Sequence, residues 1–106
     1  MQMARVIGMV VATQKDPKLV GFTLQLVQPI DIVTGDSSGK PIVAADTVGA
    51  GIGDVVMIVS GSSARLTIKT TGSPVDMAIV GIIDSVDVEG VTIYDRARED
   101  ERALGW

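Results

Sequence analysis

The chain has 106 residues, of which 46% are hydrophobic and 21% are charged, and its net charge is −4. This length predicts a single domain, and the hydrophobic fraction excludes a disordered chain. Without cysteine or histidine, the sequence has no disulfide framework, no thiolate metal site and no imidazole base. The acidic balance and the scarcity of aromatic residues argue against nucleic-acid binding. Apolar runs too short to span a bilayer argue against a membrane protein, so we expect a cytoplasmic protein.

Side chains branched at Cβ dominate the composition. The chain has 27 valines and isoleucines and 8 threonines, against only 5 leucines. Branched side chains fit a pleated sheet better than a helix. With 12 glycines and 4 prolines to make the turns, the composition predicts an all-β fold.

The first two predicted strands differ in pattern. Residues 4–13 form a continuous apolar run with two hydrophobic faces, which is typical of a strand covered on both sides. Residues 21–32 alternate instead, with Leu24 and Leu26 on an apolar face and Gln25 on the opposite one. This alternation predicts a half-buried strand.

The middle of the chain is divided by turn residues. Residues 34–41 carry dense turn signals and predict a loop. Ile42–Asp46 and Val55–Ser60 are predicted strands, and the segment between them, 48–54, has a glycine at every second position. A single helical turn is predicted at 62–66.

The last part of the chain contains the longest predicted strand. Asp76–Val88 is predicted to be one long strand, with Gly81 at a bend. Glu89–Gly90 then predicts a tight turn into a final strand at Val91–Tyr94.

Five main strands with turn-rich links predict a small barrel, because closure removes the sheet edges that an apolar β protein must hide. We expect a barrel domain over 1–94 and a tail over 95–106, in which Asp95 caps a short helix. The first strand and those at 55–60 and 77–88 are apolar on both faces. A second copy of the chain is the simplest cover for this excess, so we expect an oligomer.

The glycine loop does not match a nucleotide site. Gly49, Gly51 and Gly53 are followed by Asp54 and a strand, where a dinucleotide-binding fingerprint requires a helix. The phosphate-binding ending Gly-Lys-Ser/Thr is also absent. A tight loop with positive φ, or a closely packed backbone, is the simpler interpretation.

The remaining polar groups do not form a catalytic set. Asp84, Asp87 and Glu89 lie close in sequence but lack the spacing of a calcium loop. The serines around Gly61 have no histidine to act as a base. We interpret these groups as solvated strand ends and caps, and we expect no catalytic, cofactor-binding or metal-binding residues and no enzyme activity.

Three segments, in order along the chain, carry a resemblance to a known family. They are Val43-Ala-Ala-Asp46-Thr-Val-Gly49-Ala-Gly51, the strand Val55–Val59, and Gly61-Ser-Ser-Ala-Arg65. Together they resemble the bacterial microcompartment vertex proteins of the EutN/CcmL type. These are the pentameric shell proteins of carboxysomes and of ethanolamine- and propanediol-type organelles. Further motifs extend the resemblance to roughly residues 3–94.

The resemblance implies a five-stranded, OB-like barrel assembled as a homopentamer at the vertex of a microcompartment shell. It implies hexameric shell proteins as partners, and neither nucleic acid nor membrane. In such a ring the loops of small residues are candidates for the five-fold axis, a pore or the subunit contacts. The candidate residues are Gly49, Ala50, Gly51, Gly53, Gly61, Ser62, Ser63 and Arg65.

Three alternatives stay open at this point. An OB-like barrel can also serve as a ligand-binding or nucleic-acid-binding module, since such barrels host many functions. A small enzyme acting through Asp or Lys would need a pocket that gathers carboxylates. The strand pattern does not distinguish five subunits from six, and the motifs do not distinguish a carboxysome from a catabolic organelle.

Overall fold

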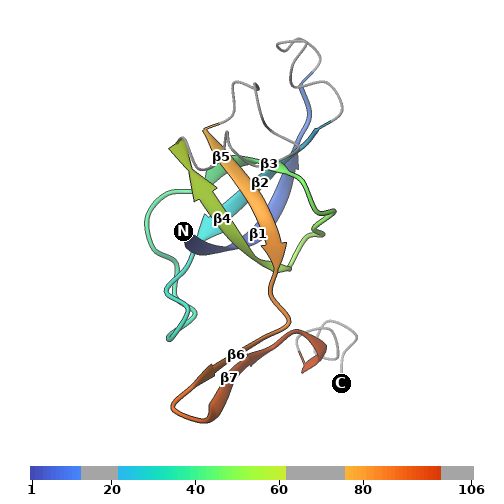
Figure 1. Ribbon diagram of the computed structural model, residues 1–106. Coiled ribbons are helices and arrows are strands. Elements are labelled where there is room, and N and C mark those ends of the chain that lie inside the picture. Colours follow the sequence, from blue (N-terminus) through green and yellow to red (C-terminus); the bar gives the residue numbers. More distant parts are fainter. Residues whose placement is uncertain (13–21, 62–75, 99–106) are drawn as a thin grey trace.

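The computed structural model describes residues 1–12, 22–61 and 76–98, and its strands form a closed barrel with a separate hairpin beneath it (Figure 1). The barrel contains five strands and the hairpin contains two. The bounds are β1 Gln2–Val10, β2 Thr23–Pro29, β3 Ile42–Asp46, β4 Val55–Ser60, β5 Met77–Ile82, β6 Ser85–Val88 and β7 Val91–Asp95. The predicted bounds of β3 and β4 are confirmed.

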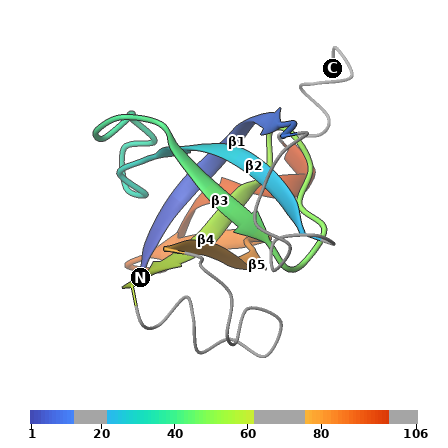
Figure 2. The same cartoon turned by 90° about the horizontal axis from the view of Figure 1, so that it is seen from above.

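The strand order around the barrel is β1-β2-β3-β5-β4. β3 and β5 run parallel, and the other neighbouring pairs run antiparallel. β1 pairs with both β2 and β4, which closes the ring of strands seen from above in Figure 2. The predicted small closed barrel of OB-like type is thereby confirmed.

The barrel interior is filled by small and β-branched side chains from all five strands. Val6, Val27, Val56, Ile58 and Ile79 are at most 1% exposed and pack into one cluster with several alanines. A barrel of five strands is narrow, so it accommodates these compact side chains rather than aromatic rings. The β-branched composition is therefore matched to the size of the interior.

The second strand turns the opposite face inward from the one expected. Gln25 is 6% exposed and Val27 is fully buried, whereas Leu24 and Leu26 are half-buried. Leu24 packs on the outside of the barrel against Ala45. Alternation identifies the two faces of a strand, but it does not reveal that Gln25 has polar partners inside the barrel. Those partners decide which face of β2 points inward.

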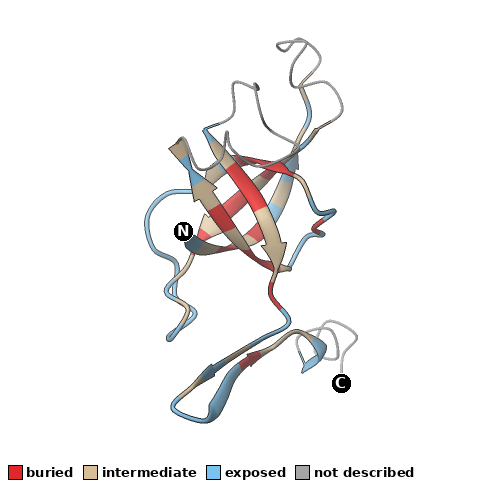
Figure 3. Cartoon of the chain, in the orientation of Figure 1, coloured by how far each residue is buried: buried red, intermediate tan, exposed pale blue. Residues whose placement is uncertain are grey.

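The predicted long strand over 76–88 is broken in two. β5 ends at Ile82, and the buried Ile83 leads the chain out of the barrel into β6. The tight turn that follows is confirmed, because Glu89 and Gly90 both have positive φ, at 50° and 81°. Two such residues match the twist of a two-residue hairpin turn. Figure 3 shows that this hairpin is mostly exposed, in contrast to the barrel.

The hairpin returns to the barrel through one small cluster. Tyr94 and Ile83 pack against the outward side chain of Val55, which is fully buried. The chain therefore covers part of the outer face of β4 by itself, where a second copy was expected to do so. The far half of β1 stays uncovered, since Ile7 and Met9 are 45% and 62% exposed.

The chain turns helical directly after β7. Residues 96–98 form the start of a helix, and the backbone N–H of Ala97 donates to Oδ1 of Asp95 at 3.0 Å. The predicted cap at Asp95 is confirmed, while the rest of the predicted helix lies outside the described residues. Within the described ranges, none of the helices is long and apolar enough to cross a membrane.

Candidate functional site

The glycine loop, residues 48–54, is held by one buried carboxylate at the end of β3. Oδ1 of Asp46 accepts the backbone N–H groups of Val48 and Gly49, both at 2.9 Å. Its Oδ2 accepts the N–H of Ala50 at 2.8 Å. An Asp side chain that accepts from the residues following it defines a tight turn, so the path of the loop is set as the chain leaves the barrel.

The amide of Gln25 attaches the same loop to the barrel interior. Its Nε2 donates to the carbonyl oxygen of Ala50 at 2.9 Å and lies 3.3 Å from Oδ2 of Asp46. Ala50 is 8% exposed and belongs to the core cluster. The glycine loop therefore inserts one small side chain into the core and acts as a structural part of the barrel.

The second half of the loop is fixed against β1. The backbone N–H of Gly53 donates to the carbonyl of Val6 at 2.8 Å, and the N–H of Val6 donates to the carbonyl of Asp54 at 2.9 Å. Nη1 of Arg5 also donates to the carbonyl of Gly53 at 2.9 Å. Oδ1 of Asp54 pairs with Nε of Arg96 at 3.1 Å, which links the loop to the segment after the hairpin.

The need for glycine differs along the loop. Gly49 and Gly53 have φ of 82° and 93°, a region that other residues rarely adopt. Gly51 is not among the residues with positive φ, and a Cβ built on it would lie 3.7 Å from Oδ2 of Asp54, an ordinary contact. We expected either positive φ or close packing to require glycine in this loop. Within one chain, neither holds at Gly51.

The rigid loop presents apolar side chains outward. Val48 is 41% exposed and Ile52 is 73% exposed. Exposed β-branched side chains on a well-ordered backbone lose little entropy when a partner covers them. The loop therefore has the properties of a preformed contact surface.

The two predicted loops of small residues are not brought together. The glycine loop precedes Val55 and Gly61 follows Ser60, so the two lie at opposite ends of β4. By strand rise these ends are about 17 Å apart. Gly61 has φ of 61°, and its N–H donates to the carbonyl of Asp76 at 2.9 Å. Ser62, Ser63 and Arg65 lie outside the described residues.

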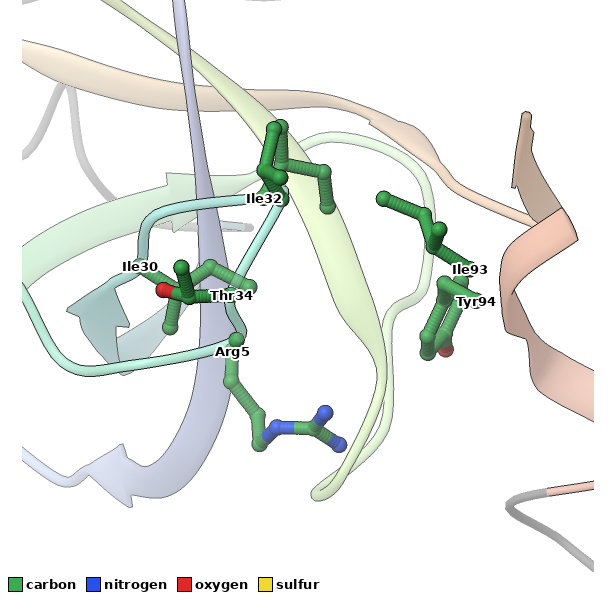
Figure 4. A pocket seen from close by; sticks show the side chains of 8 residues that line it. Arg5, Ile30, Ile32, Thr34, Ile93 and Tyr94 are labelled. Atoms are coloured by element: carbon green, nitrogen blue, oxygen red, sulfur yellow. The ribbon is translucent and has the colours of Figure 1, made fainter. Parts of the chain in front are cut away.

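A hollow lies between the barrel and the hairpin. Its volume is about 190 Å³, and Arg5, Ile30, Ile32 and Thr34 line one side while Ile93 and Tyr94 of β7 line the other (Figure 4). A second hollow of about 350 Å³ adjoins it, lined by Met1, Gln2 and Met3 and by the same Ile30 and Ile32. We call the two hollows together the hairpin cleft.

The polar side chains described at the glycine loop, Asp46 and Gln25, take part in structural hydrogen bonds. Within the described ranges, no group of three acidic or other metal-ligating side chains comes together. Asp87 accepts a hydrogen bond from the hydroxyl of Thr92 at 2.7 Å, on the exposed hairpin. The lining of the hairpin cleft has one cationic side chain, that of Arg5, and mostly apolar ones, which suits contact with a protein surface better than general acid–base chemistry.

Sequence reasoning located the glycine loop but missed the residues that hold it. Asp46 is followed at once by a glycine-rich turn, and this local signal would have identified it as a turn-forming Asp. Gln25, Arg5 and Arg96 lie 21, 48 and 42 positions from their partners. No local pattern identifies contacts at such separations.

Comparison with known proteins gives consistent results. A family model described as ethanolamine utilisation protein EutN/carboxysome matches residues 1–84. The carboxysome shell vertex protein CcmL of Synechocystis sp. is 42% identical over 106 residues, covering 96% of this chain and 100% of that protein.

Solved structures agree with this result. The structure of CcmL from Gloeobacter violaceus is similar with a TM-score of 0.84 and 41% identity, covering 92% of this chain and 99% of that one. The GrpN pentameric microcompartment shell protein of Rhodospirillum rubrum is similar with a TM-score of 0.74 and 40% identity, covering 83% of this chain and 99% of that one.

Proposed function

The chain belongs to the family of the ethanolamine utilisation protein EutN and its carboxysome relatives, and we propose that it is a structural shell protein. In this proposal five copies form a ring, and the ring occupies a vertex of a bacterial microcompartment shell. The observation that carries the proposal is the near-complete coverage of relatives named shell vertex proteins, at 42% identity. We propose the shell of such a compartment as its location.

The physical logic of a vertex supports this role. Flat hexagonal tiles cover a plane without closing, and five-fold corners supply the curvature that closes a polyhedral shell. Such a corner needs self-association and a rigid body, and it needs no catalytic group. The closed barrel, whose largest interior side chains are at most 1% exposed, provides the rigid body. The exposed apolar side chains provide the surface for self-association.

The partners follow from the same geometry. We propose hexameric shell proteins of the same compartment as neighbours of the ring. The unit that assembles is the domain over 1–94, and residues 95–106 form a tail. We also propose that the glycine loop and Gly61, with Ser62, Ser63 and Arg65, contribute to the axis or to subunit contacts. The glycine loop and Gly61 lie at opposite ends of β4.

Neither alternative function is favoured. Binding of single-stranded nucleic acid requires a basic groove with aromatic stacking platforms. The chain has a net charge of −4 and 3% aromatic residues. An enzyme acting through carboxylates requires a pocket that gathers them, and the residues that line the hairpin cleft include none.

The native mass in solution tests the proposed ring. Light scattering coupled to size exclusion should give about 55 kDa, since one chain has a mass of 11.0 kDa. The same protein, expressed together with a hexameric shell protein of its own genome, should convert open sheets or tubes into closed particles in electron micrographs. A monomer at micromolar concentration would overturn the proposal.

A further inference from the structure

The end of the glycine loop holds the carboxylate of Asp54 in a fixed position. The N–H of Asp54 donates to the carbonyl of Gly51 at 3.1 Å, and the carbonyl of Asp54 accepts the N–H of Val6 at 2.9 Å. Its Oδ2 accepts the N–H of Gly51 at 2.9 Å. The backbone and one carboxylate oxygen of Asp54 are therefore tied to the barrel and its loop, and Oδ1 is the oxygen that meets the segment after the hairpin.

Strand pairing does not fix the hairpin of β6 and β7 to the barrel. The two strands form a separate sheet, which lies beneath the barrel in Figure 1. The chain enters the hairpin from Ile83, whose N–H donates to the carbonyl of Val55 at 2.8 Å and whose side chain packs with Val55 and Tyr94. This attachment holds the near end of the hairpin, but it does not by itself determine the direction in which the far end points.

Arg96 supplies a second attachment, because its backbone closes the hairpin and its side chain reaches the barrel. Its N–H donates to the carbonyl of Asp84 at 2.8 Å, directly before β6 begins. Its Nε donates to Oδ1 of Asp54 at 3.1 Å. The Asp54 side chain is 13% exposed and that of Arg96 is 41% exposed, so the pair is partly shielded from water. Two attachments at separate points determine an orientation that one attachment leaves open.

We propose, resting on the function proposed above, that the pair between Asp54 and Arg96 sets the orientation of the hairpin and thereby controls how readily the ring assembles. The hairpin carries exposed apolar side chains, with Val91 at 63% and Ile93 at 39%. A symmetric ring needs every copy to present the same surface in the same orientation. A chain whose hairpin points elsewhere is not competent, and the apparent affinity falls with the fraction of competent chains.

The expected size of the effect follows from the number of copies in the ring. Loss of a partly exposed ion pair changes an equilibrium about twofold. Five copies each need the competent orientation, so the formation constant of the ring should fall about 30-fold. Because five chains combine, the concentration at which half of the chains are assembled changes with the fourth root of this constant, and it should rise roughly 2–3-fold.

Removing either partner tests this positioning role. Arg96→Met and Asp54→Asn each remove the pair, and the amide oxygen of the asparagine can still accept from Gly51. Sedimentation velocity over a dilution series should show the rise in midpoint concentration for each variant, and no further rise for the double variant, because both changes act through one contact. Arg96→Lys should recover part of the rise, since an ammonium group can still pair with Asp54. Arg98→Met, at an exposed position two residues later, is the matched control and should assemble like the wild type.

Salt provides a readout that a purely structural role would not change. The difference in midpoint concentration between the wild type and Arg96→Met should shrink as sodium chloride is raised from about 0.05 M to about 1 M, since ions screen the pair. Variants that assemble like the wild type, effects that add in the double variant, or a difference that salt leaves unchanged would each refute the inference. A wild type that stays monomeric would refute the proposed function instead.

Discussion

The carboxylate of Asp46 offers the sharpest test of how the glycine loop is built. Asp46→Asn preserves size and shape but replaces one acceptor oxygen with an NH₂ group. In the native chain each of the two oxygens accepts from two donors, with distances from 2.8 to 3.3 Å. Whichever way the amide is turned, two donors lose their acceptor and face a donor instead.

The expected cost follows from these contacts. A buried donor left without an acceptor costs about 1–3 kcal/mol. The two hydrogen bonds that remain lose their ionic character, at roughly 0.5 kcal/mol each. The amide can turn its NH₂ group toward the partly buried N–H groups of Val48 and Gly49, so the lower end of that range applies to both donors. We expect the free energy of unfolding to fall by about 3 kcal/mol, which corresponds to a Tm lower by roughly 12–24 °C for a domain of this size.

Thermal unfolding followed by circular dichroism measures this change. Wild type and variant must be compared at the same protein concentration, because assembly couples to stability. Asp36→Asn is the matched control, since Asp36 is exposed and its side chain is not needed to hold the glycine loop; its Tm should stay close to that of the wild type. If Asp46→Asn shifts the Tm no more than this control does, the assignment of Asp46 as the anchor of the loop is wrong.

Four further substitutions probe other parts of the structure by denaturant unfolding. Gly53→Ala should cost about 1–2 kcal/mol because of its φ of 93°, whereas Gly51→Ala should be nearly neutral; equal effects would contradict the conformational argument. Ile58→Ala should cost about 3 kcal/mol through the cavity left in the core, and a loss below 1 kcal/mol would contradict its place there. Arg96→Met should cost about 0.5 kcal/mol, since the pair with Asp54 is partly exposed, and a loss above 2 kcal/mol would indicate a larger role.

The fold was predictable where local patterns decide it. Ile42–Asp46 and Val55–Ser60 were predicted with the correct bounds, because turn residues flank two short runs of residues with high β-propensity. The turn at Glu89–Gly90 was predicted for the same reason. The break after Ile82 was not, because Ile83, Val86 and Val88 continue the β-branched pattern across Asp84 and Ser85. It depends on the packing of Ile83 against Val55 and Tyr94, which are distant in sequence.

The candidate site was predictable only as a location. Glycine spacing identified the segment 48–54. The side chain of Gln25 points into the barrel, however, whereas the opposite face of β2 was expected to do so. That reversal depends on a polar contact between β2 and the loop, and a hydrophobicity pattern contains no information about such a partner. The role of Gly61 and its neighbours in assembly stays a prediction.

The hairpin has one consequence for how the protein behaves at high concentration. Barrel closure leaves β1 to β5 without a free edge, but the sheet of β6 and β7 has two strands only, so each of them offers unpaired backbone groups. Such edges recruit strands from other molecules and start fibrils. Asp87 and Glu89, at the exposed end of the hairpin, place negative charges there, and mutual repulsion between these ends discourages stacking before the rings have formed.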